Sequence, residues 1–539
     1  MKATQFTSSN RFAATPLTAP VLLGIILFAV AALTGCSSAG TGSQIPTPRG
    51  DTKVTVLLSS TANDQLQEFG LVFQSITLTR QSGTKVILFS GLSGAEFIDI
   101  NGGVQPFATA TIPQDTYTSA SVTLGSAQFT CVTLAPSSAP YPGGIATSTF
   151  AYNQTPAANV SVNLPSPIVV TGKSMGLLLD LQVAPSATYP SCYTQGLSAF
   201  SINPNFNMTA VKLSSQPNNP RNGKVSGIAG EITAIDAANG TFTIAEPEGA
   251  LTCPCPGANS LSVSADNSTV FQGAGSFSSL AVGTLVDVDA AIQADGSLRA
   301  MRVAAYDSIA TNVMTGPLLF VSSAVPDFYL MGRKQQGQDY SARGRSMGLY
   351  ALSSSTVFQT SGQFSNVATL PFSAVFDGSN MIAGQNMSVF SQSIVSQYTG
   401  ATTITLMPQT VNGTVLSATP SGGFTDYTVS LAPDNLFPTL AVQPGQTTLL
   451  SNPTVMEIYV DGSVQRLNSQ PLASGSTLRF DGLVFNDNGT LRMDCAQVND
   501  GVTASSQSNS VGSQAGLVRT TQNASNGRAQ TMTTTRLTH

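Results

Sequence analysis

Histidine and tryptophan are almost missing from this chain of 539 residues, which has no tryptophan and a single histidine, His539, at its last position. Ser-His-Asp and Cys-His catalysis need an imidazole base, so the body of the chain cannot use either mechanism. Histidine-ligated zinc, copper and haem sites are excluded for the same reason. We therefore expect no catalytic residue and no cofactor, and we expect that the protein is not an enzyme.

Charged residues are also scarce, at 9% of the chain against about 25% in average soluble proteins. The chain has 22 basic and 27 acidic residues, spread thinly, so neither a basic groove nor a nucleic-acid partner is expected. The remainder is rich in glycine and in residues that favour strands and turns. The composition therefore predicts an all-β protein.

The first 36 residues have the pattern of an export signal. Lys2 and Arg11 form a basic start, and residues 20–32 form an apolar run that suits a signal peptide and is short for a membrane-spanning helix. The next four residues are Leu-Thr-Gly-Cys, which resembles the lipobox of bacterial lipoproteins. The resemblance implies cleavage between Gly35 and Cys36 and attachment of lipid to Cys36. The alternative is an ordinary cleaved signal, or an anchor helix with a chance cysteine.

Two serines, Ser37 and Ser38, follow this cysteine without an acidic residue beside them. By resemblance to lipoprotein sorting in Gram-negative bacteria, this pattern implies the outer membrane, at its periplasmic or surface face. The expected partners are the membrane, through the N-terminal lipid, and a glycan or a protein outside the cytoplasm.

The mature part begins with a tether and a first domain. Residues 36–52 predict a flexible tether, and residues 53–213 predict a β-sandwich-like domain with alternating apolar residues. The segments Leu71–Leu78 and Ile112–Leu124 resemble the strand motifs of an uncharacterised family of extracytoplasmic lipoprotein domains, although Asp115 stands where that family has glycine. The resemblance implies an all-β module and no known activity.

An internal repeat organises the rest of the chain. Eight of eleven residues in Ser268–Ser278 recur in Ser355–Ser365, a spacing too long for one turn of a solenoid. A fainter third copy aligns Asn222-Gly-Lys-Val225 with Asn412-Gly-Thr-Val415. The first copy resembles a second uncharacterised bacterial family with a small OB-like barrel. The predicted parts are a linker at 214–222, β-barrel-like repeats at 223–308, 309–411 and 412–502, and a disordered tail at 503–539.

The cysteines other than Cys36 predict at most a few disulfides. Cys131 and Cys192 lie in the first domain, where an oxidising compartment would favour a bridge between them. Cys253 and Cys255 are too close for an easy mutual bridge. A strained local disulfide, a bridge from one of them to Cys495, and free thiols all remain open.

A pair of acids is the other candidate site. Asp287 and Asp289 alternate with valines, so both carboxylates should share one face of a strand. Paired carboxylates could bind Ca²⁺ or act on a glycoside, but such a face is more often simply solvated. The third repeat, with Arg479 and Asp481, does not keep the pair.

These patterns favour a lipid-anchored cell-envelope β-domain protein with a non-enzymatic role in binding or scaffolding. One alternative is a polysaccharide-active enzyme that uses carboxylates alone, which needs two acids about 5–10 Å apart across a cleft. The other is a passive envelope or adhesion component.

Overall fold

The computed structural model describes most of the chain from Gly50 to Gly501. Cys36, residues 36–49 of the predicted tether, the linker and the tail lie outside the described residues. The last two residues of the predicted tether, Asp51 and Thr52, belong to the first strand of the structure instead. The residues that the structure describes are 50–61, 66–100, 103–134, 145–148, 159–188, 201–211, 213, 223–245, 260–306, 311–335, 338–339, 347–362, 364, 367–392, 399–433, 435–440 and 450–501.

The all-β fold predicted from composition is confirmed: strands dominate, and each α-helix is a single turn. The first part, here called the N-terminal module (residues 50–213), forms one large sheet in the order β3-β2-β5-β7-β12-β9-β1-β4. Its elements are β1 (Asp51–Ser60), β2 (Leu66–Arg80), β3 (Lys85–Glu96), α1 (Phe97–Ile100), β4 (Gln105–Pro113), β5 (Asp115–Leu134), β6 (Ile145–Ser148), β7 (Asn159–Asn163), β8 (Ile168–Val170), β9 (Ser174–Leu181), α2 (Val183–Ser186), β10 (Ala187–Thr188), β11 (Ser201–Ile202) and β12 (Phe206–Val211).

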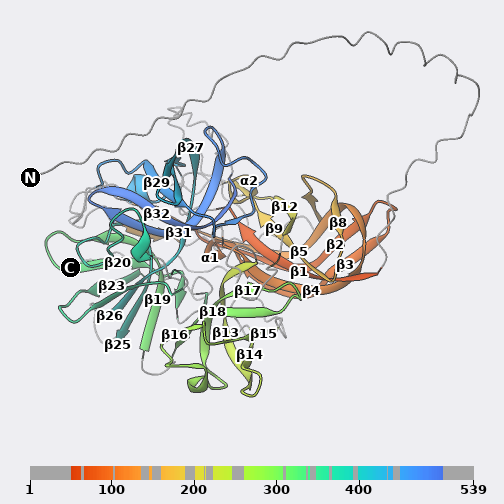
Figure 1. Ribbon diagram of the computed structural model, residues 1–539, viewed down its shortest axis with the longest axis horizontal. Helices are drawn as coiled ribbons and strands as arrows, with labels where there is room; N and C mark the ends of the chain where they lie inside the picture. The colour runs from red at the N-terminus through yellow and green to blue at the C-terminus, as the bar shows by residue number, and fades with distance from the viewer. Residues whose placement is uncertain are drawn as a thin grey trace, which may run out of the picture. The chain divides into compact units, whose positions relative to one another are not determined.

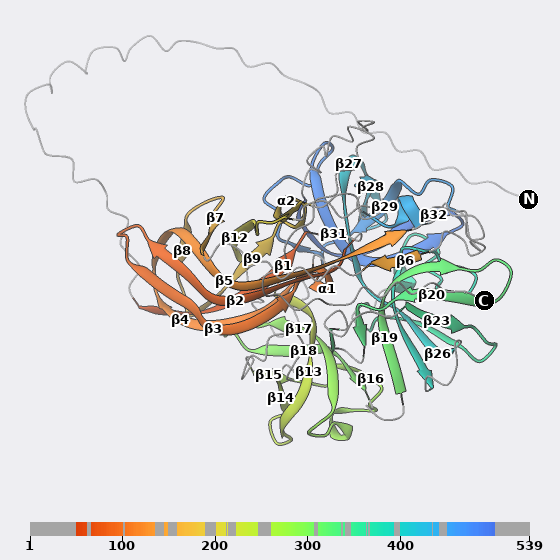
Figure 2. The ribbon, with the colours of Figure 1, turned by 180° about the vertical axis from the view of Figure 1, so that it is seen from behind.

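The large sheet folds over on itself in a sandwich-like way around one hydrophobic core. Figures 1 and 2 show its long strands β3, β2 and β5 side by side. The two end strands meet across the core, where the rings of Phe89 in β3 and Phe107 in β4 have centroids 4.9 Å apart. A turn at Ser82-Gly83 joins β2 to β3, with Gly83 at a φ of 86°.

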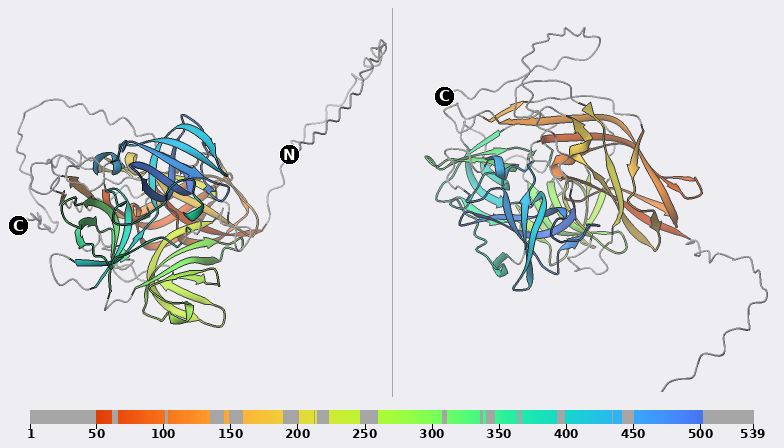
Figure 3. Two further views of the ribbon diagram at one scale, coloured as in Figure 1. Left: turned by 60° about the vertical axis from the view of Figure 1, so that its left-hand side comes forward. Right: turned by 90° about the horizontal axis from the view of Figure 1, so that it is seen from above.

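Three smaller sheets follow, called barrels 1, 2 and 3 (Figure 3). Barrel 1 comprises β13 (Lys224–Asp236), β14 (Thr241–Ala245), β15 (Leu261–Ser264), β16 (Val270–Gln272), a 3₁₀ turn (Phe277–Ser279), β17 (Leu285–Ile292) and β18 (Leu298–Tyr306). Barrel 2 comprises β19 (Thr311–Val321), β20 (Asp327–Met331), β21 (Lys334–Gln335), β22 (Gln338–Asp339), β23 (Met347–Ala351), β24 (Val357–Thr360), a 3₁₀ turn (Val367–Thr369), β25 (Asn386–Gln392) and β26 (Thr399–Leu406). Barrel 3 comprises β27 (Gln409–Ser421), β28 (Phe424–Leu431), α3 (Phe437–Leu440), β29 (Val455–Val460), β30 (Gln465–Arg466), β31 (Thr477–Asp487) and β32 (Thr490–Asp500).

The three barrels have the same topology. In barrel 1 five strands close a ring in the order β15-β14-β13-β17-β18, and β16 pairs in parallel with β18. Barrel 2 closes through β23-β20-β19-β25-β26 and barrel 3 through β29-β28-β27-β31-β32. The repeated eleven-residue segments hold the same place, because β16 and β24 each lie parallel to the last strand of their barrel. Closure removes the exposed edges that an open sheet of this size would leave.

In each barrel the first strand also makes the same backbone contacts with one turn. That turn precedes β17 in barrel 1, β25 in barrel 2 and β31 in barrel 3. Ile232, Leu318 and Val415 each donate and accept one backbone hydrogen bond there. The N–H group that donates to each of these three carbonyls belongs to a glycine with positive φ, a conformation that other residues rarely adopt. These glycines are Gly283, Gly384 and Gly475.

This register corrects the alignment of the third repeat. Gly413 occupies the place of Gly230, rather than that of Gly223, because both lie two residues before the equivalent positions Val415 and Ile232. The aligned Asn-Gly pair was therefore a chance match. The feature that Gly230 and Gly413 share is a close approach to the backbone of the next strand. It is not a turn, and the asparagine before Gly413 takes no part in it.

The modules are joined by shared hydrophobic cores. Leu57 and Leu178 lie on the face of β1 and β9 that is turned away from their own core, and they pack with the interior residues of barrel 1. Leu483 and Phe485 of barrel 3 belong to the core of barrel 2. Both strands are thus buried on both faces, over residues 54–60 of β1 and 176–181 of β9.

A buried ion pair adds to the contact between the N-terminal module and barrel 3. Arg479 donates two hydrogen bonds to the carboxylate of Asp180, at 3.1 and 3.0 Å, and also donates to the backbone oxygens of Ser60 and Asp500. Its side chain is only 2% exposed. Within the described part of the chain, no helix is long and apolar enough to span a membrane.

Candidate functional site

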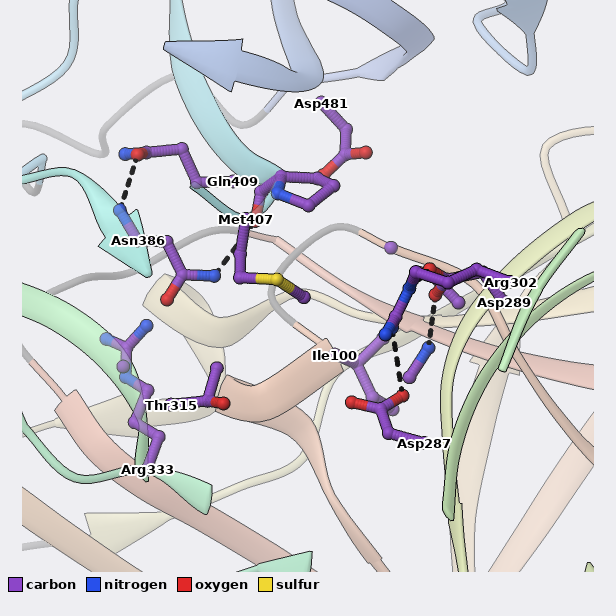
Figure 4. A pocket seen from close by; sticks show the side chains of 15 residues that line it. Ile100, Asp287, Asp289, Arg302, Thr315, Arg333, Asn386, Met407, Gln409 and Asp481 are labelled. Carbon is purple, nitrogen blue, oxygen red and sulfur yellow. Dashed lines mark hydrogen bonds and ion pairs between the residues drawn. The ribbon is translucent and has the colours of Figure 1, made fainter. Parts of the chain in front are cut away.

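Asp287 and Asp289 line a charged cavity, called the junction cavity, of about 80 Å³. All four modules contribute to its walls (Figure 4). The N-terminal module supplies Ile100, barrel 2 supplies Thr315 and Arg333, and barrel 3 supplies Gln409 and Asp481. A cavity of this size holds about two or three water molecules.

The two predicted acids face a single arginine. Arg302, one strand away in β18, places its Nε 2.5 Å from Asp289 Oδ2 and its Nη2 3.4 Å from Asp287 Oδ1. Gly227 N also donates to Asp289 Oδ1 at 3.1 Å. All three charged side chains are almost fully buried. Burial opposes the charge of Arg302, but the two carboxylates outweigh that effect and raise its pKa.

The sequence prediction for this pair is partly right. Asp287 and Asp289 do share one strand face, but that face is buried rather than solvated, because the other modules pack over it. A calcium ion at these carboxylates would have to displace Arg302. Among the described residues, no group of three or more histidine, cysteine, aspartate or glutamate side chains is arranged to hold a metal ion.

Asp481 is the third carboxylate of the cavity and has a different environment. The hydroxyl of Thr410 donates to its Oδ2 at 2.9 Å. Burial raises the pKa of Asp481 to about 6, the Thr410 hydrogen bond and Lys224 oppose the shift, and Asp289 adds to it. Asp481 therefore keeps its proton up to about pH 6, whereas the two neighbouring acids are paired with a guanidinium.

Lys224 connects barrel 1 to barrel 3 beside this acid. Its backbone N donates to Gln465 Oε1 at 3.1 Å, and its Nζ donates to Ala496 O at 3.3 Å. Burial lowers the pKa of Lys224, and burial raises the pKa of the nearby Asp494 to about 7. The junction is therefore a polar, poorly solvated region whose charges depend on one another.

A buried carboxylate with a raised pKa, such as Asp481, is one mark of acid–base catalysis. Here the geometry does not favour it, because the junction cavity has room for water but not for a sugar ring. Asp287 and Asp289 are also bound to Arg302, so neither is placed to attack a substrate. The arrangement fits a structural junction better than a glycosidase site.

The predicted cysteine sites have mixed outcomes. Cys36, Cys192, Cys253 and Cys255 lie outside the described residues, and of Cys131 only the backbone position in β5 is described. Cys495 is a buried free thiol, so a bridge between it and Cys253 or Cys255 is not what the structure shows. Burial raises the pKa of this thiol, which makes it unreactive.

Sequence reasoning missed a second pocket, called the hydroxyl-lined pocket, of about 330 Å³. It lies between β1 and β4 of the N-terminal module and β14, β15 and the β17–β18 turn of barrel 1. Of the twelve described residues that line it, seven are serine or threonine, and Lys53 is the one charged residue among these twelve. Nothing local in the sequence marked it, because its two walls are more than 100 residues apart.

Comparison with known proteins assigns no activity. The family described as "Domain of unknown function (DUF5666)" matches residues 229–304, which lie within barrel 1, so the expected resemblance of this repeat to an uncharacterised family is confirmed. No curated protein matches the chain.

Two solved structures are similar over part of the chain, and both are the single-stranded DNA-binding protein from Thermus aquaticus. The wild-type protein is 12% identical, with 39% of this chain and 97% of that chain covered and a TM-score of 0.14. A deletion mutant is also 12% identical, with 36% and 95% covered and a TM-score of 0.13. Likeness at this level carries no argument about function. The chain is thus an all-β protein of four modules, one of which matches a domain family of unknown function.

Proposed function

We propose that this chain is a lipid-anchored protein of the cell envelope that binds or scaffolds a partner and catalyses no reaction. In this proposal Cys36 carries the lipid, the outer membrane is the site of attachment, and the four β modules are the part that meets a glycan or a protein. The proposal rests on the export signal, on the modular fold and on the way the modules are joined.

The observation that carries the scaffolding role is the buried pairing of Arg479 with Asp180. Arg479 forms two hydrogen bonds with the carboxylate of Asp180, and only 2% of the arginine side chain is exposed. The two residues are about 300 positions apart in the sequence and belong to different modules. Such pairs fix geometry, because removing one partner leaves a buried charge without compensation. Together with the shared cores, this supports a body that presents its surfaces in a fixed arrangement.

The carboxylate-only enzyme has less support. The acids of the junction cavity do not suit it, because two of the three are paired with Arg302 and because a sugar ring does not fit there. A passive envelope component remains the simpler alternative to a specific binder.

A glycan array and affinity capture from envelope extracts test the proposal, with the full-length protein in mild detergent. The expected result is a reproducible ligand or partner that the Arg479→Met variant binds less well, because its modules are no longer held together. Retention of every partner by that variant would contradict the scaffolding role. A cell lacking the protein that attaches normally and loses no envelope complex would also argue against it.

A further inference from the structure

The hydroxyl-lined pocket is of the right size for a small ligand. Clefts that bind small molecules usually measure about 300–1,000 Å³, and this one measures about 330 Å³. A sugar ring with its substituents fits such a volume, whereas the junction cavity of about 80 Å³ does not admit one.

The walls of this pocket offer many hydroxyl groups. The Ser264 hydroxyl donates to Leu298 O at 3.0 Å, and that of Ser297 donates to Asp295 Oδ1 at 2.7 Å, so these two are engaged. Thr109, Thr241 and Ser262 have no side-chain hydrogen bond within the part of the chain that the structure describes, and each is at least partly exposed. Hydroxyls can both donate and accept, which suits a ligand that is itself rich in hydroxyls.

The charge in the pocket is positive. Lys53 lies against the β17–β18 turn, where a Cβ added to Gly296 would stand 3.4 Å from its Nζ. Hydrogen bonds from Ser297 N and Oγ lower the pKa of Asp295, the acid of that turn, and the charge of Lys53 adds a smaller effect. No ion pair joins Asp295 to Lys53 among the described residues. The ammonium group is therefore available to an anion at the edge of a hydroxyl-rich surface.

We infer that the hydroxyl-lined pocket binds one acidic sugar residue, with the ligand's hydroxyls on Thr109, Thr241 and Ser262 and its carboxylate on Lys53. This deepens the proposed binding role by giving it a site and a ligand class. The carboxylate is preferred to a neutral sugar because the described residues of the lining include no aromatic ring on which a neutral sugar could stack. A charge-assisted hydrogen bond is also about twice as strong as a neutral one.

Calorimetric titration of the full-length protein in mild detergent tests the inference, with D-glucuronate as the probe and D-glucose as its neutral match. We expect saturable binding of glucuronate, and binding of glucose that is about tenfold weaker, as the loss of about 1.4 kcal/mol implies. The Lys53→Met variant should lose about tenfold in affinity for glucuronate and little for glucose. The Lys85→Met variant, which removes an exposed lysine of β3 outside the pocket, should behave as wild type.

A second variant covers the case in which Lys53→Met fails to fold. Ser262→Leu places a larger apolar side chain in the pocket from β15, and it should abolish binding of glucuronate without lowering the thermal midpoint. Absence of saturable glucuronate binding to wild type, or equal binding to the wild type and to both pocket variants, would overturn the inference. Either result would leave membrane attachment and the capture of envelope partners untouched, so the two proposals fail separately.

Discussion

Arg302 shows how one residue changes the meaning of a sequence motif. The alternation of Asp287 and Asp289 with valines predicts a shared face correctly, because strand geometry alone sets it. Burial of that face could not be predicted, since it depends on modules that pack over it from elsewhere in the chain. The partner arginine lies 13 residues beyond Asp289 and is brought beside it by the register of β17 and β18.

Replacing Arg302 should expose the cost of the two buried acids. The Arg302→Met variant leaves both carboxylates without their cation, so we expect a loss of about 3–5 kcal/mol in the free energy of unfolding near pH 7. Arg302→Lys keeps a positive charge beside the acids and should lose less. Urea unfolding of both variants measures this. An equal loss for both would mean that the arginine acts by packing rather than by charge.

Asp481 predicts a pH dependence of stability. Its pKa of about 6 in the folded state lies above the model-compound value of 3.8, so the folded state retains a proton that the unfolded state has released. Stability is therefore lost as the pH rises from about 4 to about 6, by about 3 kcal/mol for this group alone. The Asp481→Asn variant should be more stable than wild type at pH 7.5 and should lack this part of the slope.

The control for this pH effect is Asp51→Asn, which changes an exposed acid at the start of β1. It should leave the slope between pH 4 and 6 unchanged. Denaturant midpoints taken every half unit of pH suffice. If Asp481→Asn keeps the wild-type slope, the acid is solvated and the junction is wetter than its geometry indicates.

At the level of elements, a close approach between neighbouring strands recurs in all three barrels. Gly230, Gly316 and Gly413 stand where a Cβ would meet a backbone oxygen of the second strand, at 2.4, 1.8 and 2.5 Å respectively. The sequence predicted the repeat of whole segments, because matching segments can be recognised locally. It could not identify these glycines, since a glycine inside a strand has many causes.

A pair of glycine substitutions tests this contact. Gly316→Ala would place its Cβ 1.8 Å from Met331 O, so β19 and β20 must separate, and we expect a loss of about 2–4 kcal/mol in stability. Gly400→Ala, in β26 of the same barrel, has nothing within 4 Å and an ordinary φ, so it should be neutral or stabilise by about 0.5–1 kcal/mol. Thermal unfolding compares them. Equal midpoints would show that the strands do not approach so closely.

At the scale of the whole molecule, the buried pair of Arg479 and Asp180 should couple the modules. We expect Arg479→Met to cost about 3–5 kcal/mol and to split the unfolding transition, because Asp180 is left as an uncompensated buried charge. Arg299→Met, which removes a more exposed ion pair with Asp266, should cost about 0–1 kcal/mol. A double-mutant cycle with Asp180→Leu measures the coupling. A single transition with no coupling energy would mean that the modules are held together by apolar contacts alone.

In the proposed function, lipid at Cys36 displays this β protein on a membrane. Metabolic labelling with a clickable palmitate analogue tests the attachment in cells that produce the wild-type protein, Cys36→Ser or, as a control that removes a buried thiol, Cys495→Ser. We expect label on wild type and on Cys495→Ser, recovered in the membrane fraction, and none on Cys36→Ser. Label that persists on Cys36→Ser, or wild type that stays unlabelled and unattached, would contradict it.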